Sequence, residues 1–324
     1  MDLSRSPEPL PSLRDTRTAC QGAQAVASAC QSVFGEVLVL RRVAESGGSI
    51  LPISRAEDVS RALRGALLRF ATDPLPAMLS GHEADGRPLG RPHAAFLALP
   101  AVTPARTPAS VGGVAIVLPR EIGEEDRQAI LLAAARWESS GARLVLGRLG
   151  EMRLARAEDG CDDTRAARPD LSQAIGAGKR VHVASPALTG LSRHWASLTP
   201  IALHRNPGNL ATREPVAAAR AAGDAEQAIA DACDHIGLPR PIHVRVARQA
   251  SFPGIPAASA FMPYPRHGSG FKRVCVHAEL EFGEPVRGPV VLGVGRYFGV
   301  GLCAALERVS GSVAFRLEID STCW

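Results

Sequence analysis

No apolar run in this chain reaches the ~18 residues that a membrane-spanning helix needs. The N-terminus carries prolines and charges in place of the apolar core of a signal peptide, so we expect a cytoplasmic protein with no membrane partner. None of the seven cysteines belongs to a CxxC pair, which favours reduced thiols over a zinc site. We therefore expect neither a metal nor another cofactor.

Lysine is scarce too: it occurs only at Lys179 and Lys272, and every other basic residue is arginine. Genomic base composition can produce this bias, although arginine is also the side chain suited to phosphate and base recognition. The net charge of +5 is compatible with a nucleic-acid partner without establishing one. At 324 residues, 46% of them hydrophobic, the chain is long enough for two ordinary domains.

The order of apolar patterns repeats along the chain. In the first copy we predict a strand at 36–43, a helix at 54–70, strands at 94–99 and 111–119, a helix at 123–140 and a strand at 142–149. In the second copy we predict a strand at 199–205, a helix at 224–236, and strands at 241–248 and 273–282. The first order is that of a ferredoxin-like fold. We therefore predict an α+β protein of two tandem ferredoxin-like (RRM-like) halves with a C-terminal Gly-rich loop. The predicted parts are a flexible extension (1–33), a first domain (34–155), a connection (156–195) and a second domain (196–324).

The stretch "GPVVLGVGRYFGVGLC" (288–303) concentrates glycines around a basic and aromatic core. Glycine weakens strands and helices, so this density indicates either a tight turn in a distorted strand or a backbone that approaches a ligand. A dinucleotide-binding fingerprint fits poorly because Phe298 occupies its third glycine position, and a P-loop would need Gly-Lys-Ser/Thr. The functional interpretation is a loop whose N–H groups approach phosphates. The candidate residues for this contact are Gly293, Gly295, Arg296, Tyr297, Gly299 and Gly301.

The segment "VVLGVGRYFGVGLC" strongly resembles the Gly-rich loop of the CRISPR-associated RAMP superfamily, whose members have ferredoxin-like folds and bind CRISPR RNA. The segments that narrow the match are "LSGHEADGRPLGRPHAAFLALP" (79–100), "VAIVLPR" (114–120), "CDHIGLPRP" (233–241) and "PAASAFMPYPR" (256–266). Together they resemble the C-terminal, endoribonuclease-like half of the fused backbone/endoribonuclease protein of type I-U (I-G) CRISPR systems, over about residues 35–304.

The resemblance implies a subunit that binds CRISPR repeat RNA, cleaves the precursor within its repeats and retains the mature CRISPR RNA in a type I effector complex. Such proteins cut without metal: the ribose 2′-OH attacks the adjacent phosphate and leaves a cyclic phosphate and a 5′-OH end. Fused relatives carry a backbone-subunit half as well, so we expect a separate backbone-like subunit among the partners.

Two other functions stay open. Relatives often carry a histidine-rich turn where this chain has "VTPARTPASVGG" (102–113), so the alternative is a non-catalytic subunit that holds CRISPR RNA. The other open function is that of a small-molecule enzyme whose Gly-rich loop is unrelated to this superfamily.

RNA cleavage of this kind needs a general base, a general acid and positive charge on the phosphorane, roles that suit histidine and arginine. His82 is the first catalytic candidate, because the resembling endoribonucleases keep a catalytic histidine between the first helix and the second strand. His93 opens that strand and is the second, and Arg87 is a candidate for stabilising the phosphorane. The alternatives are a polar turn residue for His82 and solvated positions for the other two.

A basic hairpin with aromatic residues, "YPRHGSGFKR" (264–273), is a candidate grip on an RNA stem or its flanking nucleotides. One face of the strand at 241–248 is a further candidate for lining an RNA cleft. An ordinary solvated hairpin and an ordinary solvent face are the alternatives. The candidate RNA-binding residues of these two segments are Arg266, Lys272, Arg273, His243 and Arg245.

Overall fold

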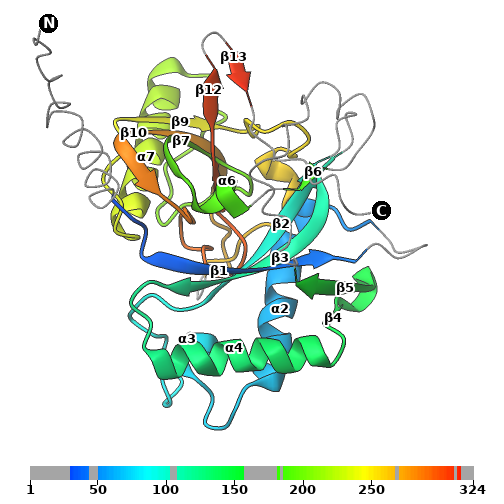
Figure 1. The fold of residues 1–324 in the computed structure, drawn as a ribbon. Helices are drawn as coiled ribbons and strands as arrows, with labels where there is room; N and C mark the ends of the chain where they lie inside the picture. The colour runs from blue at the N-terminus through cyan, green and yellow to red at the C-terminus, as the bar shows by residue number, and fades with distance from the viewer. Residues whose placement is uncertain are drawn as a thin grey trace, which may run out of the picture.

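The computed structural model describes residues 30–43, 50–102, 108–156, 181–182, 185–266, 270–309 and 312–314. Most of the predicted extension and most of the predicted connection lie outside these residues. The described chain is an α+β protein built on two larger antiparallel sheets, which confirms the predicted class (Figure 1). No helix in the described ranges combines the length and the apolar character needed to cross a membrane.

The first sheet has six strands in the order β4-β5-β1-β3-β2-β6, and all neighbouring strands are antiparallel. Helices α2 (Ala56–Phe70) and α4 (Glu124–Ser139) lie on one side of it (Figure 1). The predicted apolar face of α2 is confirmed, because Val59, Leu63 and Leu67 are fully buried at helical spacing. The strands are β1 (Phe34–Arg42), β2 (Ala95–Val102), β3 (Ser110–Pro119), β4 (Arg143–Val145), β5 (Glu151–Arg156) and β6 (Val181–His182).

The strand predicted at 142–149 exists but is shorter than predicted. Strand β4 stops early, and positive φ angles of 59° at Gly147 and 90° at Gly150 turn the chain back. The Leu146 N–H donates to the carbonyl of Gly150 at 2.8 Å and closes this turn. Strand β5 follows, and β5 is the one that pairs with β1. The apolar run at 142–149 therefore forms the first strand of a hairpin and the turn that follows it, because glycines end the strand early.

The second sheet has five strands. Four of them are paired in the order β11-β7-β10-β8, and the fifth, β9, pairs with β10. Helix α7 (Pro215–Asp234) buries Ala225, Ile229 and Cys233. The strands are β7 (Leu191–Ser197), β8 (Ile201–Ala202), β9 (His243–Ala247), β10 (Cys275–Arg287) and β11 (Cys303–Ala305). The shorter elements of the chain are η1 (Ile53–Arg55), α3 (Ala77–Ser80), η2 (Gly147–Leu149), α6 (Ser185–Thr189), η3 (Ala258–Ala260), β12 (Glu307–Val309) and β13 (Ser312–Ala314).

The start of the second half differs from the prediction, whereas β9 and β10 confirm the strands predicted at 241–248 and 273–282. The strand predicted at 199–205 shrinks to the two residues of β8, and the strand between β11 and β10 is β7. Helix α7 begins at Pro215 instead of Asp224, because the Glu214 carboxylate caps it by accepting from the Val216 N–H at 3.0 Å. The alanine-rich first turns carry few large apolar side chains, so periodicity did not reveal them.

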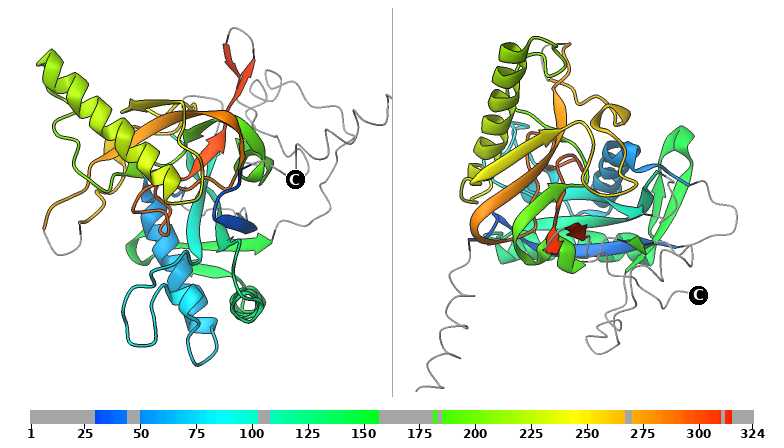
Figure 2. Two further views of the ribbon diagram at one scale, coloured as in Figure 1. Left: turned by 90° about the vertical axis from the view of Figure 1, so that its left-hand side faces the viewer. Right: turned by 90° about the horizontal axis from the view of Figure 1, so that it is seen from above.

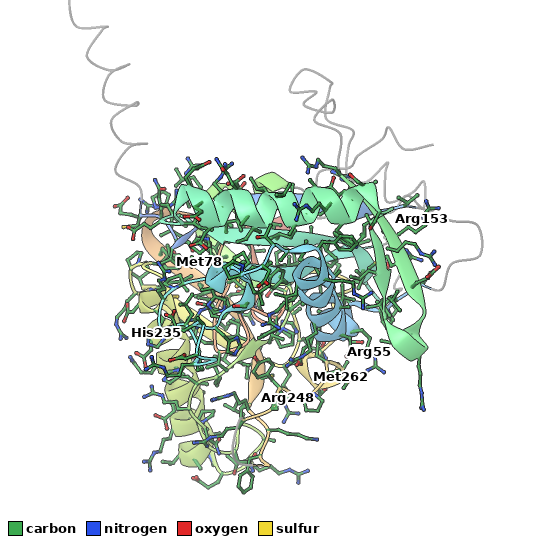
Figure 3. The ribbon with its side chains drawn as sticks, turned by 90° about the horizontal axis from the view of Figure 1, so that it is seen from below. Arg55, Met78, Arg153, His235, Arg248 and Met262 are labelled. Carbon is green, nitrogen blue, oxygen red and sulfur yellow. The ribbon has the colours of Figure 1, made fainter. Side chains whose placement is uncertain are left out.

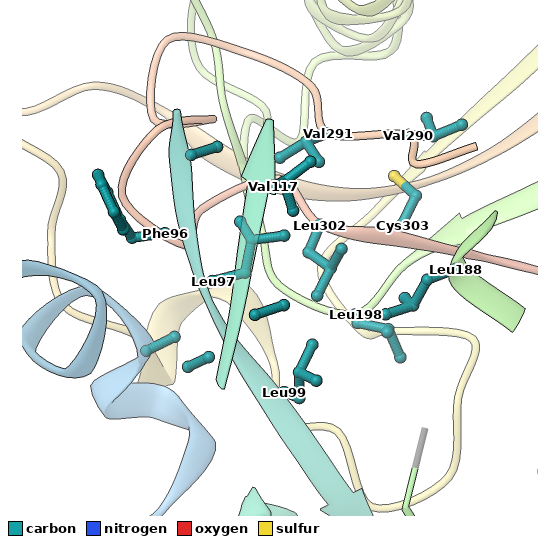
Figure 4. Close-up of a cluster of buried hydrophobic side chains, with 14 of the residues drawn as sticks. Phe96, Leu97, Leu99, Val117, Leu188, Leu198, Val290, Val291, Leu302 and Cys303 are labelled. Atoms are coloured by element: carbon teal, nitrogen blue, oxygen red, sulfur yellow. The ribbon is translucent and has the colours of Figure 1, made fainter. Parts of the chain in front are cut away.

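One hydrophobic core joins the two halves. Phe96 and Leu97 of β2 and Val117 of β3 lie near Val291 and Leu302 of the second half (Figure 4). The backbones pair as well: β2 and the Gly-rich stretch form a short parallel bridge. The two further views show the halves packed against each other (Figure 2). The Gly-rich stretch therefore lies at the seam between the halves.

Candidate functional site

The glycines of the Gly-rich stretch are buried and lie against the protein itself. A Cβ atom at Gly293, where φ is +81°, would stand 2.5 Å from the carbonyl oxygen of Ala202. At Gly299, where φ is +74°, a Cβ would overlap Ser60 Oγ on helix α2. The close approach that the sequence indicated is thus made to β8 and α2. Contact of these residues with RNA phosphates stays a prediction. The four glycines predicted to contact RNA, Gly293, Gly295, Gly299 and Gly301, are all buried.

Two half-buried side chains of the same stretch, Arg296 and Tyr297, lie beside His93 of the first half. The ring of Tyr297 stacks on His93, with centroids 3.6 Å apart and planes 21° apart. The Arg296 guanidinium lies 4.7 Å from the centroid of the Tyr297 ring, and its Nη1 donates to the Gly293 carbonyl at 3.1 Å. The Phe96 N–H donates to the Tyr297 carbonyl at 3.1 Å. Arg296, Tyr297 and His93, all predicted as site residues, are therefore brought into one stack.

Helix α2 adds two arginines that the sequence analysis missed. The guanidinium carbons of Arg61 and Arg64 lie 4.7 Å and 5.8 Å from the centroid of the Phe298 ring. Burial and the neighbouring charge of Arg61 lower the pKa of Arg64. Their spacing of three residues, which places both on one face of the helix, was the available signal in the sequence.

The second-half loop after η3 approaches the same helix from its N-terminal end. Arg55 precedes α2, and its Nη1 donates to the Met262 sulfur at 3.1 Å (Figure 3). The second half therefore contacts helix α2 at its N-terminal end and at Arg61 and Arg64 in its middle.

His82 and Arg64 meet on one backbone oxygen. The Ser80 carbonyl accepts a hydrogen bond from Arg64 Nη2 and lies 3.0 Å from His82 Nδ1. Because a carbonyl can only accept, we assign the ring hydrogen to Nδ1, which leaves a lone pair on Nε2 of the neutral imidazole. The His82 side chain is exposed, and its backbone N–H donates to Ser80 Oγ at 3.1 Å. The turn after α3 thus presents a proton acceptor beside a guanidinium.

His93 is held differently. Its Nδ1 lies 3.4 Å from the Arg91 carbonyl, and its Nε2 faces Gly81, where an added Cβ would stand 2.7 Å away. Burial lowers the pKa of His93 to about 4, the Arg91 contact opposes the shift, and the charges of Arg296, Arg64 and His82 add to it. The ring is therefore neutral at pH 7. A catalytic role for His93 stays a prediction. We call the following residues the seam site: Arg61, Arg64, His82, His93, Arg296, Tyr297 and Phe298.

The third catalytic candidate, Arg87, forms an ion pair with a nearby carboxylate. Its Nε forms an ion pair of 2.6 Å with the Asp85 carboxylate, and 81% of its side chain is exposed. An open hollow of about 470 Å³ beside it is lined by Glu83 and Asp85 as well as by Arg87. The carboxylates oppose phosphate binding there, and stabilisation of a phosphorane by Arg87 stays a prediction.

On β9, Arg245 is also engaged. Its Nε donates to Glu279 on β10 at 3.1 Å, its Nη2 makes a second bond to the same carboxylate, and the hydrogen bonding with Glu279 raises the pKa of Arg245. His243 is exposed on the same strand. Their predicted place in an RNA cleft is untested.

The residues predicted in the basic hairpin lie close together in the structure. Pro265 and Lys272 form an antiparallel bridge, and the Arg273 N–H donates to the Tyr264 carbonyl at 2.9 Å. Arg266, Lys272 and Arg273 line a second hollow, of about 280 Å³. Within the described ranges, no group of three or more His, Cys, Asp or Glu side chains is arranged to hold a metal ion.

Comparisons with known proteins add a family. A solved structure titled "CRISPR associated protein Cas6" covers 84% of this chain and 98% of its own, with 11% sequence identity and a TM-score of 0.36, a similarity too distant to assign a fold or an activity. No curated protein sequence matches the chain. The model of the family described as "CRISPR-associated protein, GSU0054 family" matches residues 49–305, which is most of the chain. The chain therefore belongs to the GSU0054 family of CRISPR-associated proteins.

Proposed function

We propose that the seam site binds CRISPR repeat RNA and cleaves it within precursor CRISPR RNA, and that the chain retains the product in a type I effector complex. The observation that carries this proposal is the Ser80 carbonyl shared by His82 and Arg64, because it places a proton acceptor beside a fixed positive charge. Membership of a CRISPR-associated family makes CRISPR RNA the expected substrate.

In the proposed reaction His82 is the general base. Its Nε2 takes the proton from a ribose 2′-OH, the 2′-oxygen attacks the adjacent phosphorus, and the bond from phosphorus to the 5′-oxygen breaks. The departing oxygen takes a proton from water. Arg64 faces the negative charge that gathers on the phosphorane, and its hydrogen bond to Ser80 holds it ready. The products are a 2′,3′-cyclic phosphate and a 5′-OH end.

RNA binding beside the base would use the cationic and aromatic side chains of the seam. Arg61, Arg64 and Arg296 place three guanidinium groups around the Tyr297 and Phe298 rings, and that of Arg61 also pairs with Glu57 at 2.6 Å. Cations neutralise phosphates, and aromatic rings stack on unpaired bases, so the combination suits single-stranded RNA. His93 would act here as a positioning residue that fixes the Tyr297 ring by stacking.

We further propose that the two halves are tandem ferredoxin-like domains. The order β5-β1-β3-β2 of the first half corresponds to β11-β7-β10-β9 of the second. In the second half the Gly-rich stretch occupies the position of the second helix, between β10 and β11. This replacement explains why a glycine-rich segment reaches across to α2.

One observation favours a non-catalytic subunit that holds CRISPR RNA. The lowered pKa of His93, about 4, means that this imidazole carries no positive charge at neutral pH, so it is not the charged general acid that a two-histidine mechanism uses. In this alternative the seam site binds RNA through the same cations and rings.

End-labelled repeat RNA, incubated with the purified chain in EDTA, separates the two. We expect cleavage at one position, with a 2′,3′-cyclic phosphate on the upstream product. Tight binding without cleavage assigns the holding role. Absence of binding above that of an unrelated RNA refutes both.

A further inference from the structure

The hollow of about 280 Å³ lies where the hairpin arms 264–266 and 270–273 meet the segment that follows β8. Four of its lining residues are cationic, and none of its described lining residues is acidic. The Asp231 carboxylate, which is not in the lining, lies 3.7 Å from Arg205 Nη2 and 3.8 Å from His204 Nε2. The hollow therefore favours a ligand with negative charge. Its cationic lining residues are Arg205, Arg266, Lys272 and Arg273.

An aromatic ring stands in the wall of this hollow. Phe271 is 76% exposed, although a side chain of its size is usually packed away from water. An exposed aromatic ring among cations is the arrangement on which proteins stack unpaired bases. An anion such as inorganic phosphate would use the cations and leave this ring without a partner.

The protein holds the walls in place. Arg273 Nη1 donates to the carbonyls of Leu203 and His204, at 3.3 Å and 2.9 Å. Arg273 Nε is buried without a hydrogen-bond partner among the described residues. The backbone N–H of Arg266 donates to the Phe271 carbonyl at 2.9 Å, which fixes the base of the hairpin. The hollow is thus built by tertiary contacts and not by loose side chains alone.

One buried side chain links the hollow to the seam site. Tyr264 lies between them: burial and the charge of Glu57 raise the pKa of its hydroxyl, while Arg61 of the seam and Arg273 of the hollow oppose the rise. The Tyr264 hydroxyl also donates to the Val294 carbonyl, 3.4 Å away in the Gly-rich stretch. Tyr264 therefore joins the hairpin to the Gly-rich stretch, and it is a buried side chain that both sites affect.

We propose that this hollow binds one unpaired nucleotide of the RNA that occupies the seam site, with its base on Phe271 and its phosphate among Arg205, Arg266 and Lys272. This inference rests on the proposed function. A volume of about 280 Å³ falls at the lower end of small-ligand pockets, so it suits one nucleotide and excludes a duplex. The subsite holds an unpaired flank of the repeat and so helps to set the register of the RNA at His82.

Binding in a cleavage-defective His82→Ala background tests the subsite. Two fluorescent probes are compared by anisotropy: the full repeat RNA, and the same RNA trimmed of its unpaired flanks. Phe271→Ala is expected to lower affinity for the full repeat between about fivefold and about hundredfold, and to leave the trimmed RNA unaffected. Lys272→Ala is expected to weaken binding of the full repeat and to reduce the slope of log affinity against log salt by about 0.7. The matched controls are Val145→Ala and Arg148→Ala, exposed residues of the first half outside both sites.

The outcomes are distinct. If Phe271→Ala binds the full repeat as tightly as Val145→Ala does, the nucleotide subsite is refuted, whether or not the wild-type chain cuts RNA. If Lys272→Ala alone weakens binding, the hollow is a phosphate contact only and the base-stacking proposal is wrong. If the flanked and trimmed RNAs lose affinity equally, the hollow binds the stem instead. If the chain binds no repeat RNA, the proposed function and this inference fail together.

Discussion

Replacing Gly299 by alanine tests the packing that places the Gly-rich stretch against helix α2. Gly299 has a φ of +74°, and a Cβ there would overlap Ser60 Oγ and stand 3.2 Å from the Ala56 carbonyl oxygen. Ser60 is fully buried, and its hydroxyl has no hydrogen-bond partner among the described residues. Gly299→Ala must therefore either strain the loop or push it away from the helix.

The expected loss of stability has two parts. Alanine in the left-handed region costs about 1–2 kcal/mol, and overpacking a buried contact costs about 1–3 kcal/mol. We expect Gly299→Ala to lower the free energy of unfolding by about 2–5 kcal/mol. Gly86→Ala is the matched control, because Gly86 has a φ of +83° with no atom within 4 Å of an added Cβ. Only the conformational part, about 1–2 kcal/mol, is expected there.

A double-mutant cycle measured by urea unfolding isolates the contact with helix α2. Ser60→Ala removes the unpartnered hydroxyl and is expected to be nearly neutral by itself. In the Gly299→Ala background it should restore about 1 kcal/mol or more, because the clash with Oγ is gone. Equal losses for Gly299→Ala and Gly86→Ala, with no coupling to Ser60→Ala, would refute the packing of the stretch against α2.

Three further predictions concern His277, Arg64 and Arg296. Burial lowers the pKa of His277 from 6.5 to about 4, with its ring between Ser197 Oγ and the Pro256 carbonyl, so the unfolded chain binds a proton that the folded chain refuses. The contribution of His277 to the free energy of unfolding is complete above pH 6.5 and falls by about 1.4 kcal/mol per pH unit between pH 6.5 and 4. The free energies of unfolding of wild type and His277→Asn, measured in urea, should therefore diverge over that range. Parallel pH profiles would contradict the burial argument. Arg64→Ala should slow single-turnover repeat cleavage by about 10²-fold or more, and Arg64→Lys should recover only part of the rate, since an ammonium lacks the planar fork that reaches both Ser80 and a phosphate; full activity in Arg64→Lys would show that charge alone suffices. Arg296→Ala should flatten the slope of log RNA affinity against log salt by about 0.7, and an unchanged slope would remove Arg296 from phosphate binding.

Local periodicity was sufficient to predict much of the fold. Helix α2, strands β2 and β3, and helix α4 follow from apolar spacing that the core then uses. The errors occur where spacing carries little information. The alanine-rich start of α7 shows no large apolar period, and glycine turns inside an apolar run concealed the hairpin of β4 and β5. Pairing partners of short strands such as β8 depend on distant segments, which spacing does not encode.

The candidate site was only partly predictable. His82, Arg296 and Tyr297 were named from the sequence, and the structure brings them to one seam through contacts more than 200 residues apart in the chain. Arg61 and Arg64 were missed, because the polar face of a helix is usually solvated and only tertiary contact with Phe298 distinguishes these two. The sequence does not tell what the glycines approach, since backbone that approaches a ligand and backbone that approaches a helix have the same sequence signature.

The central claim is that His82 acts as the base of an RNA-cleaving site at the seam. Its most direct test is the single-turnover rate of repeat cleavage in EDTA, measured together with RNA affinity, for wild type, His82→Ala and the control His235→Ala. His235 is an exposed histidine at the end of α7, outside the seam site. We expect His82→Ala to cut about 10²–10⁴-fold more slowly than wild type while it binds repeat RNA with nearly unchanged affinity, and His235→Ala to match wild type in both. Wild-type cleavage by His82→Ala would contradict the account.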